Sequence, residues 1–151
     1  MIALRDINRQ VTLREVLKSL SDLAEATLQA TVGLMSRDLD GPRRRSPRGL
    51  RLAVLGLGRL GYREMDYASD VDLVFVCEET DRSGRALTLA RVWCERIVRT
   101  LSSLSREGQL YRVDLRLRPS GGEGELVTTL AGLVDYFRQA AGNLGGWYAG
   151  T

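Results

Sequence analysis

The chain has 151 residues, 44% of them hydrophobic and 27% charged, a formal net charge of +3, and no histidine. This length suits a single compact domain, and the composition is too apolar for a disordered chain. The missing histidine excludes histidine-based catalytic triads and histidine metal sites.

No apolar run reaches the roughly 18 residues that a membrane span needs, so we expect a cytoplasmic protein with no membrane partner. The positive charge is almost entirely arginine, with Lys18 as the only lysine. A modest positive balance is compatible with phosphate-bearing ligands, but it does not indicate a nucleic-acid partner, and we expect none.

Apolar residues at helical spacing predict a long N-terminal helix from Val11 to about Met35, with Thr12 and Glu15 forming a capping box at its start. The segment 41–48 follows, with two prolines and four arginines. We interpret it as a solvated loop, and the alternative is a patch that binds polyanions.

The remaining elements follow from the spacing of apolar residues and from turn residues. They are strands at 50–57, 70–77 and 110–118, a helix at 83–106 capped by Ser83, a glycine-rich turn at 119–124, and a helix at 129–141. The first strand is nearly continuously apolar and is predicted to be buried. The fold class is therefore α+β (α/β), a mixed sheet with flanking helices, formed by a domain at 1–141 and an irregular or truncated tail at 142–151.

Cys77 falls on the second predicted strand and Cys94 on the helix after it. We predict that both are reduced core residues and belong to neither a disulfide nor a zinc site.

Three aspartates are candidate metal ligands. Side chains alternate along a strand, so Asp70 and Asp72 share one face about 7 Å apart, where two oxygen ligands can converge on one cation. Asp114 lies on the polar face of the third strand. Carboxylates without histidine or thiolate suit a hard ion such as magnesium. The alternatives are a solvated strand edge or turn for the pair, and for Asp114 an ion pair with Arg116 or Arg112.

The first strand runs into Gly56–Gly61, which matches the dinucleotide fingerprint GxGxxG. Only the nine residues from Tyr62 to Asp70 separate this turn from the next strand. A parallel crossover needs about 10 to 12 residues or more, which argues against a dinucleotide-binding oxidoreductase. The turn is either a plain tight turn or a cradle whose amides hold a triphosphate. No GK[ST] motif is present, so a P-loop is excluded.

Three segments carry a resemblance to a known family: Gly56–Glu64, Ser69–Leu73 and Val113–Gly121. From about Ile2 to Gln139 the chain resembles the glutamine synthetase adenylyltransferases, enzymes with adenylyl-transferring and adenylyl-removing halves. The resemblance implies a polymerase-beta-like nucleotidyltransferase fold. It also implies transfer of AMP from ATP to a tyrosine of glutamine synthetase, or its removal by phosphorolysis, under control of a PII signalling protein.

Carried over by position, the resemblance implies a Mg²⁺ site and a nucleotide site. Asp70, Asp72 and Asp114 match the metal-binding and catalytic carboxylates, and Gly58, Arg59, Gly61 and Ser69 match residues beside the nucleotide. Arg59 stands where the family usually has lysine, and Tyr62 where it often has glycine. The residues near Glu64–Asp72 and Gly121–Val127 favour the transferring half.

The family usually continues beyond Asp135–Phe137 into a further helical region, so we expect a fragment with little activity of its own. The alternative function is a catalytically incomplete regulatory or interaction module of the same fold.

Overall fold

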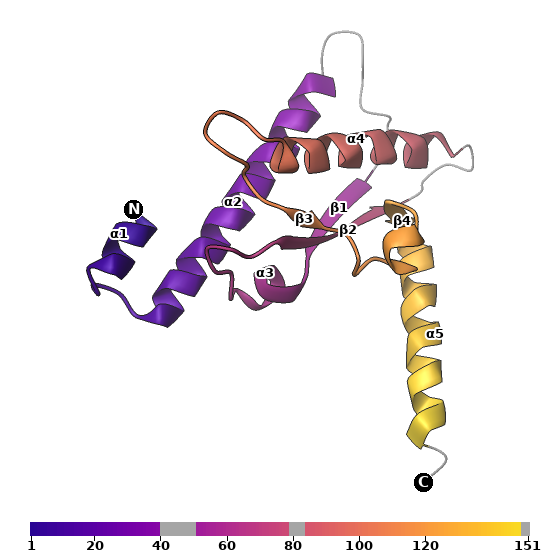
Figure 1. The fold of residues 1–151 in the computed structure, drawn as a ribbon. Coiled ribbons are helices and arrows are strands. Elements are labelled where there is room, and N and C mark those ends of the chain that lie inside the picture. The colour runs from indigo at the N-terminus through magenta and orange to yellow at the C-terminus, as the bar shows by residue number, and fades with distance from the viewer. Residues whose placement is uncertain (40–50, 79–83, 149–151) are drawn as a thin grey trace.

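The computed structural model describes residues 1–39, 51–78 and 84–148. The helices are α1 (Ile2–Ile7), α2 (Leu13–Leu39), α3 (Gly58–Tyr62), α4 (Arg85–Ser102) and α5 (Leu130–Tyr148), with a short 3-10 helix, η1 (Gly121–Glu123). The strands are β1 (Arg51–Gly56), β2 (Val71–Glu78), β3 (Val113–Asp114) and β4 (Val127–Thr129). Figure 1 shows α2 and α4 lying beside a small sheet, while α5 extends away from it.

The sheet is mixed and centred on β2. β1 runs antiparallel along one edge of β2, with Arg51 opposite Glu78 and Gly56 opposite Leu73. β3 and β4 are both parallel to β2 and pair with its beginning and its end, respectively. The predicted mixed sheet with flanking helices is therefore confirmed.

The long N-terminal helix is also confirmed, and α2 continues to Leu39. Its capping box forms as predicted: the backbone N–H of Thr12 donates to the Glu15 carboxylate at 2.7 Å, and the N–H of Glu15 donates to the Thr12 hydroxyl at 3.3 Å. The basic segment 41–48 and the predicted cap Ser83 lie outside the described residues.

The core forms where one face of β2 meets α2 and α4. The buried residues of this core come from all three elements. They are Val71, Leu73, Phe75 and Cys77 from β2, Ala24 and Leu28 from α2, and Ala90, Cys94, Ile97 and Leu101 from α4. The two cysteines are buried in the core, as predicted. Burial raises the pKa of the Cys94 thiol to about 12, so this thiol is chemically inert at neutral pH.

The prediction that the first strand is buried is wrong. β1 alternates between exposed and partly buried residues, and Leu55 is 39% exposed. The reason is its position at the edge of the sheet, where only the face carrying Leu52 and Val54 packs against the core. An apolar run of this length therefore does not require burial on both faces.

Two further boundaries differ from the prediction. The third strand is only Val113–Asp114, because the chain leaves β2 after Asp114 and loops back as β4, which was not predicted. Arg118 closes this loop by donating to the backbone carbonyls of Leu115, Gly122 and Gly124. An alternating pattern cannot reveal where strand pairing stops.

The last helix was predicted to end near Ala141, with an irregular tail after it, but α5 continues to Tyr148. Glycine costs about 1 kcal/mol in a helix relative to alanine, yet it retains the N–H that the helical ladder needs. A glycine-rich segment without proline can therefore stay helical. α1 was not predicted either. Within the described residues no helix is both long and apolar enough to cross a membrane.

Candidate functional site

A cavity of about 370 Å³ lies where β2 begins beside β3. Five of the residues predicted to form the site line it: Asp70, Asp72, Asp114, Arg59 and Ser69. Asp66, Ala68 and Arg116 complete the lining. We call it the carboxylate cavity. The structure therefore brings together residues from three separate stretches of the chain.

The strand register explains this convergence. Asp72 on β2 is the direct partner of Asp114 on β3, and the N–H of Val71 donates to the Arg112 carbonyl at 2.9 Å. Burial raises the pKa of Asp72, and the neighbouring carboxylates of Asp114 and Asp70 raise it further. Burial and these two acidic neighbours therefore disfavour the charged form of Asp72.

Asp114 makes the ion pair that was the alternative interpretation of this residue. Arg116 donates to its carboxylate from Nε at 2.8 Å and from Nη2 at 2.5 Å, and the backbone N–H of Arg116 adds a bond of 2.8 Å. The Arg116 guanidinium and this backbone bond lower the pKa of Asp114. The Asp114 side chain is 14% exposed and that of Arg116 is 82% exposed, so the arginine lies at the solvent side of the carboxylate.

Asp70 is paired as well. The Nε of Arg112 donates to its carboxylate at 2.6 Å, and Nη2 of the same guanidinium donates to the Ala68 carbonyl at 3.2 Å. Of the three aspartates, only Asp72 lacks a direct arginine partner among the described residues.

The glycine turn packs directly on Asp72. Gly58 has a φ of +51°, and a Cβ atom there would lie 2.2 Å from Oδ2 of Asp72. The N–H of Leu57 donates to the Asp72 carbonyl at 2.9 Å. Gly61 lies further from the site: its N–H donates to the Leu57 carbonyl at 3.0 Å, and a Cβ there would meet the Gly56 carbonyl at 3.0 Å. Gly58 thus has a steric role beside the carboxylates, whereas Gly61 has a packing role within α3.

Asp66 is a site residue that the sequence reasoning missed. Its carboxylate accepts from the N–H of Ala68 and from the Ser69 hydroxyl, each at 2.9 Å, and it pairs with Arg59. The hydrogen bond from the Ala68 N–H is the main cause of its lowered pKa. Asp side chains in loops often accept from the backbone N–H two residues on, as in an Asx turn, so the aspartate in this short loop was the signal available in the sequence.

The donor set fits a hard cation, because it consists of carboxylate oxygens only. In the described residues, however, no three acidic, histidine or cysteine side chains converge on one point that could hold a metal ion. Asp70 and Asp114 each face an arginine instead. A cation at this cavity would share these carboxylates with the arginines: Arg112 contacts only Oδ1 of Asp70, whereas Arg116 contacts both oxygens of Asp114.

The pairing of β1 and β2 bears on the dinucleotide alternative. These strands are antiparallel, and only the five-residue α3 and a short loop connect them. A dinucleotide-binding unit needs two parallel strands joined by a full crossover helix. This arrangement excludes the dinucleotide-binding interpretation of the glycine turn.

The curated relatives that this chain matches belong to one class of protein, the adenylyltransferases. The family model described as glutamate-ammonia ligase adenylyltransferase matches residues 1–144, and the chain belongs to this family.

Three curated relatives illustrate the match, and each is named bifunctional glutamine synthetase adenylyltransferase/adenylyl-removing enzyme. The Burkholderia mallei protein is 38% identical over 147 residues, which cover 90% of this chain and 16% of the relative. The Burkholderia pseudomallei protein is 37% identical with the same coverage, and the Streptomyces coelicolor protein is 35% identical over 93% of this chain and 14% of its own length. The chain therefore spans about one sixth of the relatives it matches.

Proposed function

We propose that this chain is a Mg²⁺-dependent nucleotidyltransferase domain that transfers AMP from ATP to a tyrosine of glutamine synthetase, or removes it by phosphorolysis. The observation that carries the proposal is that Asp70, Asp72 and Asp114 line one cavity together with Arg59. The names of the relatives supply the reaction and the protein substrate.

Asp70 and Asp72 would hold a shared cation, with Asp114 as its third ligand. Bound Mg²⁺ would lower the pKa of the acceptor hydroxyl and neutralise the charge of the triphosphate. Arg59 and Arg116 border the same cavity and provide positive charge for phosphate oxygens. Gly58 allows the turn to approach Asp72 without a side chain in between.

Several finer features belong to the same proposal. The mixed sheet is compatible with a polymerase-beta-like nucleotidyltransferase fold. Because the chain spans only part of its relatives, control by a PII signalling protein is proposed for the longer protein. The segments Glu64–Asp72 and Gly121–Val127 favour the adenylylating direction.

The test uses the purified chain, first in calorimetry with ATP and with NAD, each with and without Mg²⁺. We expect Mg²⁺-dependent ATP binding and no preference for NAD. The chain is then incubated with glutamine synthetase, ATP and Mg²⁺, and mass addition on the synthetase is followed. We expect slow transfer or none, because most of the length of the relatives is outside this chain.

Three outcomes separate the alternatives. Tight NAD binding without metal would contradict the nucleotidyltransferase proposal. ATP binding that is unchanged by Mg²⁺ and by Asp72→Asn would contradict the three-carboxylate site. Mg²⁺-dependent ATP binding with transfer as fast as that of a complete enzyme would contradict the alternative of a catalytically incomplete module of the same fold.

A further inference from the structure

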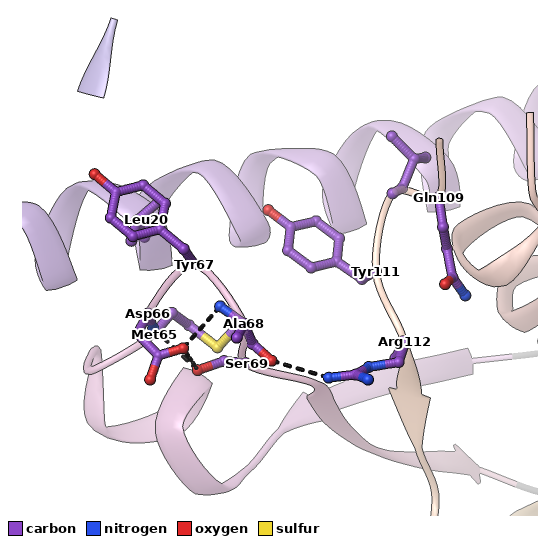
Figure 2. Close-up of a pocket in the computed structure, with 10 residues that line it drawn as sticks. Leu20, Met65, Asp66, Tyr67, Ala68, Ser69, Gln109, Tyr111 and Arg112 are labelled. Atoms are coloured by element: carbon purple, nitrogen blue, oxygen red, sulfur yellow. Dashed lines mark hydrogen bonds between the residues drawn. The ribbon is translucent and has the colours of Figure 1, made fainter. Parts of the chain in front are cut away.

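A second cavity, of about 450 Å³, borders the same 66–69 loop as the carboxylate cavity. We call it the tyrosine cavity, because Tyr67 and Tyr111 line it together with Leu20, Met65, Gln109 and Arg112. Figure 2 shows the two tyrosine rings in front of α2 and Arg112 reaching toward the loop. The two cavities share Asp66, Ala68 and Ser69 in their walls. The proposed function assigns no role to this second cavity.

The lining combines two kinds of surface. Two phenol rings and a partly buried leucine form the apolar part, whereas Met65 is 1% exposed and offers almost no surface. Arg112 supplies a guanidinium whose side chain is 67% exposed. Aromatic rings pack against planar apolar groups, and guanidinium binds carboxylate and phosphate groups. A cavity of this volume is within the range that encloses small ligands.

Arg112 also has hydrogen-bonding capacity left for a ligand. A guanidinium has five N–H groups. The hydrogen bonds of Arg112 to described residues use one N–H on Nε, toward Asp70, and one on Nη2, toward the Ala68 carbonyl. A ligand anion can therefore bind Arg112 without first breaking its pair with Asp70.

We propose that the tyrosine cavity binds a small molecule consisting of a planar aromatic ring and one anionic group, and that this binding is coupled to cation binding at Asp70. The ring packs against Tyr67 and Tyr111, and the anion binds Arg112. The coupling, but not the site itself, rests on the proposed function.

The coupling follows from charge. A ligand anion on Arg112 lies beside the Asp70 carboxylate, which the same guanidinium contacts at 2.6 Å. Two anions that share one arginine repel each other, and a cation on Asp70 relieves that repulsion. Mg²⁺ then strengthens binding of the ligand, and by linkage the ligand strengthens binding of Mg²⁺ to the same extent.

The test is calorimetry of phenyl phosphate binding to the purified chain in metal-free buffer, with inorganic phosphate and phenol as the two halves of the probe. We expect phenyl phosphate to bind more tightly than either half. Arg112→Gln should weaken it by about tenfold or more, because a charge-assisted hydrogen bond is lost. Arg91→Gln is the matched control, since Arg91 is a similarly exposed arginine on α4 that pairs with Glu95 and Glu125.

A second variant keeps the test decisive if Arg112→Gln fails to fold. Leu110 lines the tyrosine cavity and is 55% exposed, so its replacement leaves the core intact. Leu110→Glu should weaken binding of the anionic probe, whereas Leu110→Gln, which has the same shape without the charge, should affect it less. Equal binding of phenyl phosphate and inorganic phosphate to the unmodified chain would overturn the site. Binding that is unchanged in both Arg112→Gln and Leu110→Glu would also overturn it.

The coupling is measured by repeating the titration in Mg²⁺, where we expect phenyl phosphate to bind about fivefold more tightly or better. A chain that is thermally stabilised by Mg²⁺ but whose probe affinity is unchanged would overturn the coupling. A chain that Mg²⁺ does not stabilise would instead contradict the proposed function, while the metal-free titration would still decide the tyrosine cavity.

Discussion

Asp72 and Asp114 are direct partners on the parallel strands β2 and β3, yet their carboxylates are in opposite electrostatic situations. The pKa of Asp72 is raised by burial and by its acidic neighbours, whereas the pKa of Asp114 is lowered by hydrogen bonds from Arg116. Arg116 therefore pairs directly with Asp114, whereas Asp72 has no direct arginine partner among the described residues.

Asp72→Asn should leave the metal-free protein as stable as the unmodified chain or more stable, because it removes a repelling charge and keeps the side-chain shape. It should also abolish most of the stabilisation by Mg²⁺, which is about 2.7 kcal/mol for a ligand at 100 times its dissociation constant. Thermal melting with and without Mg²⁺ measures both effects. Asp22→Asn is the control, since Asp22 pairs with Lys18 and Arg63 outside the carboxylate cavity. An undiminished Mg²⁺ response in both Asp72→Asn and Asp114→Asn would show that the three-carboxylate site is wrong.

The two aspartates should also give opposite pH dependences. A raised pKa means that the contribution of Asp72 to stability is full at low pH and is lost as the pH rises through its folded-state pKa, which lies above 3.8. The lowered pKa of Asp114 means that its contribution is present above 3.8 and is lost as the pH falls through the folded-state value.

Melting curves between about pH 3 and pH 7 check these signs. Any stability gained by Asp72→Asn at neutral pH should disappear on acidification, and so should any stability lost by Asp114→Asn. Mg²⁺ binding should weaken on acidification as Asp72 becomes protonated. Differences from the unmodified chain that stay constant with pH would contradict both assignments.

Arg116→Gln should tighten Mg²⁺ binding several-fold, because Arg116 competes with the cation for the Asp114 carboxylate. The metal-free variant should be slightly less stable, since this arginine is largely exposed and exposed ion pairs contribute little. Isothermal titration with Mg²⁺ measures the affinity. Arg138→Gln, which affects an ion pair with Asp135 on α5, should bind Mg²⁺ like the unmodified chain. Weaker binding in Arg116→Gln would mean that Arg116 supports the metal site.

Gly58→Ala should destabilise the protein and weaken Mg²⁺ binding. Its φ of +51° costs an alanine about 1 kcal/mol or more, and the new Cβ would displace the Asp72 carboxylate from its position. Gly33→Ala is the control, because Gly33 lies within α2 and nothing is within 4 Å of a Cβ there. That change should stabilise by about 0.5–1 kcal/mol. Chemical denaturation of both variants tests the prediction, which fails if Gly58→Ala retains full stability and Mg²⁺ affinity.

Ser21→Ala should cost about 1–3 kcal/mol of stability, the typical penalty for a buried donor left without a partner. The Ser21 hydroxyl is buried, donates to the Leu17 carbonyl at 2.9 Å, and accepts from the backbone N–H of Met65 at 3.1 Å. The bond from the Met65 N–H links the segment that precedes Asp70 to α2. Ser19→Ala is the matched control, because the Ser19 hydroxyl donates only to the Glu15 carbonyl of its own helix. Equal unfolding free energies for the two variants would show that the Met65 contact contributes nothing.

Local patterns in the sequence were sufficient for much of the fold. The capping box of Thr12 and Glu15 marks the start of α2, because its two hydrogen bonds involve residues three positions apart. The alternation that begins at Val71 predicts β2, and the short loop before it argued correctly against a parallel crossover. The helix start, the strand and the antiparallel connection depend on residues close together in the sequence and on the length of one loop, so the sequence alone predicts them.

The sequence also indicated Asp70, Asp72 and Asp114 as candidate metal ligands, but only the tertiary structure showed which residues surround them. Arg116 pairs with Asp114, which was one of the two alternatives for that residue, whereas Arg112, the other, pairs with Asp70 instead. The limits of β3, the presence of β4 and the exposure of β1 depend on which backbone groups find partners across the sheet. Alternation and composition describe one segment at a time, while pairing, burial and the charge around a carboxylate arise between segments that only folding brings together.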